Sequence, residues 1–163
     1  MLRALNIKEA KNKMANVKVK FIDTDKAKLR VNSTDVIKEE SIALSNRLRS
    51  AFAMCKGKAS GLSAIQLGIP KRACVVKFED DVMVLFNPIT VSTENEVENV
   101  EGCMSIPGKL FKVKRYNNVV VQAYNKKWEY VELRLEGTPA HIIQHEIDHM
   151  NGKLICDIGT PAE

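Results

Sequence analysis

The segment His145-Glu146-Ile147-Asp148-His149, near the end of the chain, constrains the fold most. Two histidines four residues apart lie on one face of an α-helix, about 6 Å apart along its axis, so both imidazoles can reach one metal ion. Glu146 lies beside them, where a general base is needed for metal-assisted chemistry. With 3 His among 163 residues, chance would produce this pattern about 0.004 times. The sequence therefore predicts a metal-binding helix.

The limits of this helix follow from its flanking residues. Thr138 can cap it, Pro139 suits the first helical position, and no breaker follows until Asn151-Gly152. His141 lies one turn before His145, but it is about 12 Å along the axis from His149, too far to share one ion. We therefore expect His141 to line a pocket or to be partly exposed, and the third ligand to come from elsewhere.

The rest of the chain predicts an α+β fold in a single domain covering residues 1–163. Apolar residues at helical spacing predict one N-terminal helix from Thr34 to Gly57, capped by Ser33 or Thr34. Residues 1–33 are expected to be extended or irregular. Antiparallel strands packed around the C-terminal helix are expected at 73–78, 82–86, 89–93, 119–124 and 128–135, with turns at Asp80-Asp81 and 125–127.

A candidate for the third ligand lies in Glu101-Gly102-Cys103-Met104-Ser105. A cysteine after a glycine, between a charged residue and a serine, suits a thiolate presented on a tight strand or turn. A cysteine can also be merely a small core residue. Combined with the two histidines, Cys103 would complete a two-His, one-Cys site with an open position for water.

Charge and cysteine content limit the remaining function classes. Residues 1–60 hold 14 basic and 6 acidic side chains, whereas residues 61–163 hold 11 and 14. The basic third can attract phosphates or simply favour solubility, and the chain has no Arg-rich run. The 4 cysteines form no CxxC pair and predict free thiols in a reducing compartment. No apolar run approaches a membrane span, so we expect a cytoplasmic protein that does not bind membranes.

At three ordered segments the sequence resembles the peptide deformylases. These segments are Gly61-Leu-Ser-Ala-Ile-Gln-Leu-Gly68, Glu101 to Ser105, and Gln144 to Gly152. The resemblance spans about residues 34–158. It implies a metal-dependent hydrolase that removes the N-formyl group from the N-terminal formylmethionine of new polypeptides and releases formate.

The resemblance also assigns individual roles. It implies that Cys103, His145 and His149 are the metal ligands and that Glu146 is the proton shuttle. It places Gln66 and the backbone N–H of Met104 at the oxyanion, and the backbone near Gly61 against the substrate peptide. It suggests Arg115 as a structural partner for Asp148, although Asp148 could also be simply exposed. It implies Fe(II) as the metal, whereas the ligand types by themselves are also compatible with zinc, nickel or cobalt.

The chain departs from the family pattern in four places and in length. Ala59 replaces a usual glycine, Ser63 a usual alanine, and Met104 and Met150 usual leucines; none of these removes an acid, a base or a ligand. Bacterial members typically continue into a C-terminal basic helix, so a chain ending at Glu163 resembles a short form of the kind that phages encode. The expected location is then a bacterial or phage-host cytoplasm. We expect a monomer that acts on N-formylmethionyl nascent peptides and contacts the ribosome, if at all, through its basic N-terminal third.

Two alternatives compete with this interpretation. A zinc endopeptidase would share the helix, but it would need a downstream His or Glu ligand, and only Glu163 follows. If the chain were a nucleic-acid or ribosome-binding module with a structural metal, the segment around Gln66 would have no function. A chain of this length also needs no metal merely to fold.

Overall fold

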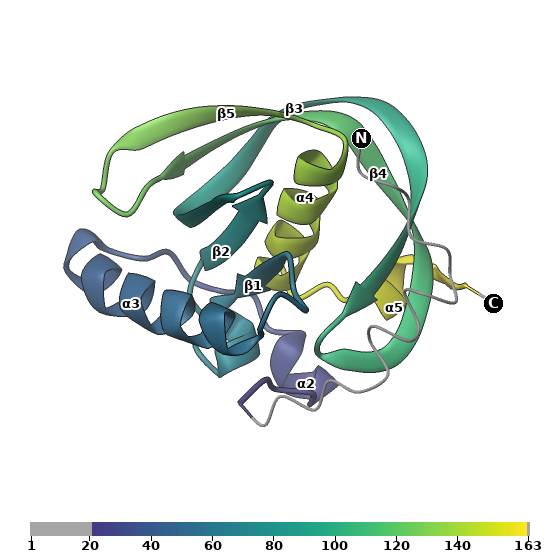
Figure 1. Cartoon of the computed structure of the whole chain (residues 1–163), viewed down its shortest axis with the longest axis horizontal. Helices are drawn as coiled ribbons and strands as arrows, with labels where there is room; N and C mark the ends of the chain where they lie inside the picture. The colour runs from purple at the N-terminus through teal and green to yellow at the C-terminus, as the bar shows by residue number, and fades with distance from the viewer. Residues whose placement is uncertain (1–20, 163) are drawn as a thin grey trace.

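The structure is a computed structural model that describes residues 21–162. One curved sheet wraps around a central helix, and a second long helix packs on the opposite side of the sheet's first two strands (Figure 1). The elements in chain order are α2 (Lys26–Leu29), α3 (Lys38–Met54), β1 (Gly61–Ser63), the 3-10 helix η1 (Ala64–Leu67), β2 (Ala73–Phe78), β3 (Asp81–Cys103), β4 (Ile106–Tyr124), β5 (Tyr130–Glu136), α4 (Thr138–Met150), α5 (Ile155–Ile158) and β6 (Thr160–Pro161). The predicted α+β class is confirmed.

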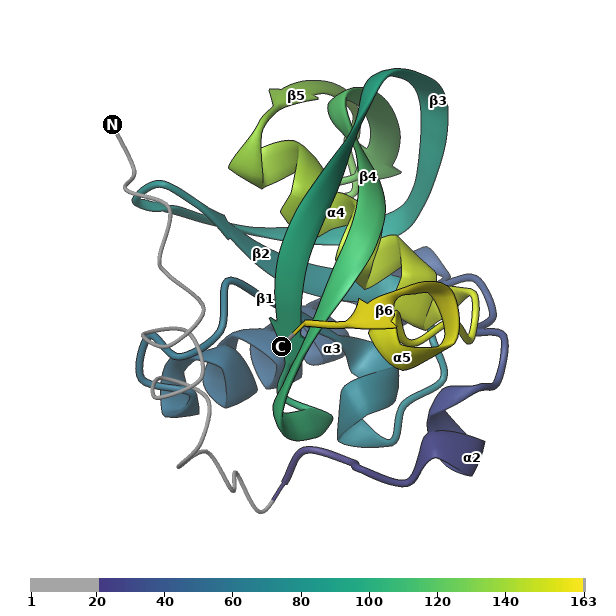
Figure 2. The same cartoon turned by 90° about the vertical axis from the view of Figure 1, so that its right-hand side faces the viewer.

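The sheet has the order β1-β2-β3-β4-β5, and β6 pairs separately with β4. All these pairs are antiparallel. β3 pairs with β2 only as far as Phe86; its pairing with β4 then shifts register between Phe86 and Ile89. Asn87 has a positive φ of 51° at this irregularity. Such irregularities bend a strand, and here β3 and β4 continue together as a long curved ribbon (Figure 2).

Alternating side chains on β1 and β2 serve two separate cores. Leu62 and Val75 are buried in the cluster that contains Leu44 and Leu48 of α3. Residues of the opposite parity, such as Val76, are buried with Ile143 and Met150 of α4. Because side chains alternate along a strand, one short pair of strands supports a helix on each face. This arrangement presents β1 directly to α4.

Helix α4 is also fixed to β4 by two polar side chains. The amide of Gln144 pairs with the backbone of Tyr116 in both directions, accepting from its N–H at 2.9 Å and donating to its carbonyl at 2.7 Å. One turn further along, Asp148 accepts a hydrogen bond from Arg115. The helix between these anchors carries His145, so its rotation relative to the ribbon is fixed.

Several predicted boundaries are wrong. The predicted strands at 82–86 and 89–93 are parts of one strand that runs to Cys103, and 128–135 begins only at Tyr130. The first hairpin turn lies one residue earlier than predicted, at Glu79-Asp80. Trp128 has a positive φ of 62°, which places it in the turn.

Both predicted helix caps are also wrong. α3 begins after Ile37, whose N–H donates to the Glu40 carboxylate, because Thr34 pairs instead with the Lys71 segment. Gly137, not Thr138, caps α4. Within the expected irregular segment 1–33, residues 1–20 lie outside the described part of the chain, and α2 shows that residues 26–29 are helical.

Candidate active site

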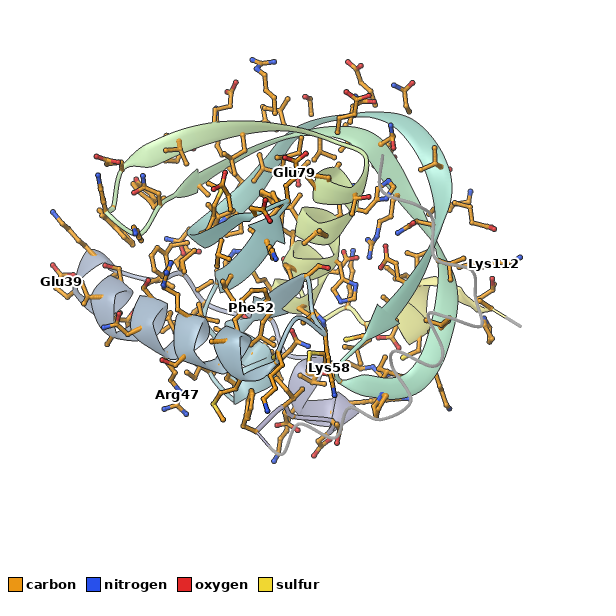
Figure 3. All side chains as sticks on the ribbon, viewed as in Figure 1. Glu39, Arg47, Phe52, Lys58, Glu79 and Lys112 are labelled. Atoms are coloured by element: carbon orange, nitrogen blue, oxygen red, sulfur yellow. The ribbon has the colours of Figure 1, made fainter. Side chains whose placement is uncertain are left out.

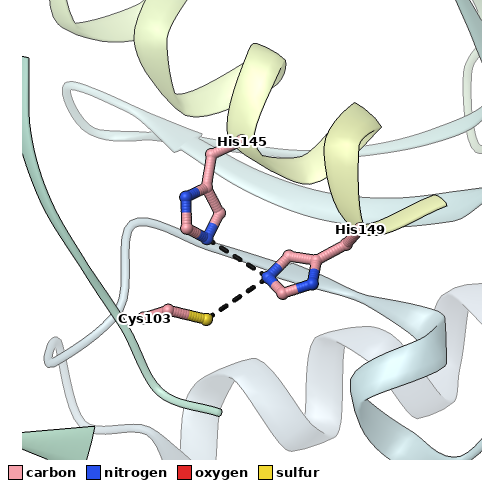
Figure 4. Close-up of side chains that lie close together, drawn as sticks. All are labelled: Cys103, His145 and His149. Atoms are coloured by element: carbon pink, nitrogen blue, oxygen red, sulfur yellow. Dashed lines mark hydrogen bonds between the residues drawn. The ribbon is translucent and has the colours of Figure 1, made fainter. Parts of the chain in front are cut away.

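The side chains of Cys103, His145 and His149 converge at one point beside α4 (Figure 4). The two histidine Nε2 atoms are 3.2 Å apart, and the Cys103 Sγ lies 3.3 Å from Nε2 of His149. All three candidate ligand atoms lie within 4.8 Å of one another. The helix therefore presents both imidazoles to the same point as the thiol, which comes from a distant segment.

Cys103 reaches this point because it is the last residue of β3. Met104 and Ser105 form the turn that leads into β4, and Cys103 pairs across it with Ile106. The side chain is buried, with 3% of its surface exposed. The prediction that Cys103 is presented on a strand or turn is confirmed, because it ends β3 and adjoins the turn.

The spacing of these atoms fits a metal ion. A tetrahedral cation bound at about 2.0 to 2.1 Å by nitrogen and about 2.3 Å by sulfur would separate two nitrogens by about 3.3 Å and nitrogen from sulfur by about 3.6 Å. The observed separations of 3.2 and 3.3 Å are close to these values. Three ligands of this kind leave a fourth position free, as in catalytic zinc-type sites.

Electrostatics favour the thiolate, which is the form that binds metals. Burial raises the pKa of Cys103, but the imidazoles of His149 and His145 outweigh it and hold that pKa well below its ordinary value. For His145, burial lowers the pKa, but hydrogen bonds with Cys103 and Glu101 outweigh burial and raise the pKa well above the ordinary value. The two imidazoles thus favour the thiolate form of Cys103.

Behind His145 lies a buried network of charged groups. The His145 Nδ1 atom is 3.0 Å from a Glu101 carboxylate oxygen. Arg115 donates to both oxygens of Glu101, at 2.7 and 2.9 Å, and to Asp148 at 2.5 Å. The predicted pairing of Arg115 with Asp148 is confirmed. The network fixes the orientation of the His145 ring so that its Nε2 faces the ligand cluster.

Glu146 is buried on the side of α4 that faces β1. Its carboxylate accepts a hydrogen bond from the Ser63 hydroxyl at 2.7 Å, and a methyl group on Gly61 would lie only 2.4 Å from its other oxygen. Burial raises the pKa of Glu146, while the charges of His145 and His149 and the bond from Ser63 act in the opposite direction. A raised pKa suits a group that accepts and releases a proton near neutral pH.

Gln66 connects the 3-10 helix to the ligand cluster. Its side-chain carbonyl accepts from the N–H of Ser63 at 3.0 Å. Its NH₂ group therefore faces the other way, donating to Ser105 at 3.1 Å and approaching the Cys103 sulfur at 3.8 Å. Met104 lies in the adjoining turn. The predicted oxyanion donors are thus close to the metal ligands.

His141 lies outside the ligand cluster, as the helical spacing predicts. It is half-buried, and among the described residues its Nε2 has no hydrogen-bond partner. Burial lowers its pKa.

Sequence reasoning missed two features of the site. It gave Glu101 no role, although a carboxylate two residues before a candidate ligand on a strand shares that ligand's face. It noted Ser63 only as a departure from the family pattern, without a partner. No sequence signal indicated that β1 would face α4, so the contact between Ser63 and Glu146 was not predictable.

The fold and the site together define a metal-dependent hydrolase. A family model described as polypeptide deformylase matches residues 13–162. The chain therefore belongs to the peptide deformylase family, whose members remove the N-formyl group from nascent polypeptides.

Individual relatives agree in sequence and in structure. A peptide deformylase from Aquifex aeolicus is 38% identical over 130 residues, covering 76% of this chain and 75% of that protein. The crystal structure of peptide deformylase from Thermotoga maritima superposes with a TM-score of 0.79 at 31% identity, covering 86% of this chain and 97% of that one. A probable peptide deformylase from Synechococcus phage S-SSM7 gives a TM-score of 0.75 at 34% identity, covering 84% and 97%.

Proposed function

We propose that residues 1–163 act as one catalytic domain in which Cys103, His145 and His149 bind a single divalent cation. The convergence of these three side chains within 4.8 Å is the observation that carries the proposal. A bound cation would supply Lewis acidity, which lowers the pKa of water and polarises a carbonyl group. The protein side chains would then orient the substrate and move its protons.

Glu146 is the group that we propose to carry the proton. It accepts the proton of the attacking water and later donates it to the leaving amine. The Gln66 NH₂ and the backbone N–H of Met104 donate hydrogen bonds to the oxygen of the formyl group as it becomes negative. Preorganised donors of this kind commonly contribute about 3 kcal/mol each to a lower barrier. The direction of the Gln66 NH₂, toward Cys103, supports this role.

The substrate is an N-formylmethionyl peptide, as the family implies, and we propose that its backbone lies along β1 near Gly61. β1 is the first strand in the sheet order, and β2 is its sheet neighbour on one side. The other edge of such a strand offers backbone N–H and carbonyl groups to an extended peptide. Gly61 also lies directly against Glu146, so a peptide bound there would place its formyl group near the base.

We propose Fe(II) as the working metal, with zinc, nickel or cobalt able to occupy the site in a purified sample. A buried thiolate with two imidazoles is compatible with all four ions. Oxygen-sensitive activity that returns on anaerobic addition of Fe(II) would support iron. Equal specific activity of the zinc form would contradict it.

Further proposals concern the setting of the enzyme. Its similarity to the phage protein leads us to place it with the phage-type deformylases, acting as a monomer in the cytoplasm of a bacterium or of a phage host. The basic N-terminal third is the surface that we propose for ribosome contact. Its exposed basic side chains include Lys26, Lys28, Lys38, Arg47, Arg49, Lys56 and Lys58, and Figure 3 shows Arg47 pointing away from the body of the protein. Among residues 21–162, no helix is both long and apolar enough to cross a membrane.

Formate release from formyl-Met-Ala-Ser tests the central proposal. We expect turnover that a chelator abolishes and that Glu146→Gln lowers by about a thousandfold or more while the metal stays bound. Acetyl-Met-Ala-Ser and the internal peptide bonds should remain intact. Cleavage of internal peptide bonds would instead favour an endopeptidase. If the wild type and Glu146→Gln were both inactive and the protein bound RNA tightly, a binding module would be favoured.

A further inference from the structure

Two residues of β1 face the carboxylate of Glu146. Gly61 and Ser63 are two positions apart and therefore share one face of the strand, whereas Leu62 faces the core beneath α3. Gly61 permits the close approach of Glu146, and Ser63 provides a hydroxyl group to bind it.

The Ser63 hydroxyl contacts Glu146 at two atoms. It lies 2.7 Å from the carboxylate Oε2 and 3.0 Å from the backbone carbonyl oxygen of the same residue. Ser63 is fully buried, and Glu146 is 3% exposed. A hydrogen bond to a charged group is stronger than one between neutral groups, and here little water competes for either partner.

A glutamate carboxylate needs such a partner to keep a fixed orientation. Its terminal torsion is broad and roughly two-fold, so the side chain alone does not hold its oxygens in place. Here Ser63 binds Oε2, and Gly61 leaves room for Oε1, which would lie only 2.4 Å from a methyl group on that residue. β1 thus accommodates the carboxylate at Gly61 and binds it at Ser63.

We propose that Ser63 is a positioning residue, which holds the Glu146 carboxylate in the orientation needed to exchange a proton with the reacting groups. This inference rests on the proposed role of Glu146. The geometry suits that role because the hydroxyl contacts both the side chain and the backbone of Glu146, at 2.7 and 3.0 Å, and so fixes the residue relative to β1.

The test compares Ser63→Ala with the wild-type holoenzyme on formyl-Met-Ala-Ser. We expect kcat to fall about tenfold, with KM within twofold and the metal content and Tm close to the wild-type values, because the contact orients a reacting group rather than binding substrate or metal. Ser45→Ala, which removes a buried hydroxyl from α3, is the matched control and should leave kcat unchanged. Unchanged kcat in Ser63→Ala would overturn the proposal. A drop in metal content or in Tm large enough to explain the lower kcat would also overturn it.

A double substitution separates action through Glu146 from action elsewhere. Glu146→Asp shortens the side chain by one methylene and withdraws the carboxylate from Ser63. Ser63→Ala should therefore cause less than a twofold further loss of kcat in the Glu146→Asp protein. An undiminished tenfold loss there would show that Ser63 acts on another group and would overturn the proposal.

Experiments on Glu146 distinguish failure of the proposed function from failure of the inference about Ser63. If Glu146→Gln keeps wild-type activity, the role of Glu146 is wrong, and the inference about Ser63 falls with it. If Glu146→Gln is inactive while Ser63→Ala is as active as the wild type, only the inference about Ser63 is wrong.

Discussion

The two faces of the β3–β4 ribbon carry similar ion pairs in opposite environments. On the inner face, toward α4, Glu101 pairs with Arg115, and their side chains are 8% and 4% exposed. On the outer face, Glu96 pairs with Lys114 at 3.2 Å, and their side chains are 47% and 79% exposed. Arg115 and Lys114 are neighbours in sequence, so the alternation of the strand alone assigns them to opposite faces.

The difference between these faces shows that burial decides how much an ion pair matters to the stability of the protein. An exposed pair contributes about 0 to 1 kcal/mol, because water screens it and its long side chains lose entropy. A buried charge that loses its partner costs several kcal/mol. The inner face therefore tolerates Glu101 and Arg115 only as a complete network, whereas the outer pairs, including Lys112 in Figure 3, can be changed freely.

The largest loss of activity is expected when Cys103, the candidate metal ligand on the inner face, is replaced. Cys103→Ala should abolish metal binding and lower formate release by at least about a thousandfold, equivalent to about 4 kcal/mol in the barrier. Elemental analysis and the deformylation assay measure the two effects. Cys156→Ala, which removes a half-exposed thiol outside the cluster, is the control. Full activity without bound metal in Cys103→Ala would refute the site.

Arg115→Ala tests the inner network itself. It leaves Glu101 and Asp148 without their shared cation, so we expect the free energy of unfolding to fall by about 3 to 5 kcal/mol. Metal affinity should fall about 10- to 100-fold, because Glu101 would no longer hold the His145 ring firmly. Denaturant titration and metal competition measure these quantities. A loss below 1 kcal/mol would mean that the two faces do not differ in the way described.

Acid should weaken the same network. Burial raises the pKa of Glu101, but the hydrogen bonds from Arg115 and His145 outweigh it and lower the pKa to about 2. A carboxyl group with a lowered pKa contributes stability that is fully present above its unfolded pKa, near 4.5, and is lost as the pH falls from there through 2. The loss should be roughly 3 kcal/mol. Unfolding of the metal-free protein at several pH values measures it, and Glu101→Gln should lack this component.

The outer face should show the smallest effect. Lys114→Ala breaks the exposed pair with Glu96, and we expect the free energy of unfolding to change by less than about 0.5 kcal/mol, with activity unchanged. Thermal unfolding at low and high salt measures the difference. Because Lys114 adjoins Arg115, it is the matched control for that substitution. If Lys114→Ala lowered the free energy of unfolding as much as Arg115→Ala, the two faces would not differ in the way described.

The parts of the fold that the sequence predicted well have strong local patterns. Helix α4 has a clear periodicity and a proline near its start, and residues 73–78 are rich in apolar residues and form β2 as expected. The segment from Glu94 to Asn99 gave no strand signal, because both its faces are largely exposed and it is rich in Glu and Asn. Its extended form depends on backbone pairing with β4, which no local pattern reveals.

The sequence by itself determined the chemistry: two imidazoles at helical spacing, a carboxylate between them and a thiol in a turn-forming segment. Only the tertiary structure decided which groups support that chemistry. The pairing of Glu101 with Arg115 and the contact of Ser63 with Glu146 join residues 14 and 83 positions apart. Ligand spacing within one helix is fixed by local geometry, whereas such contacts depend on how a strand and a helix pack, and packing is a property of the whole chain.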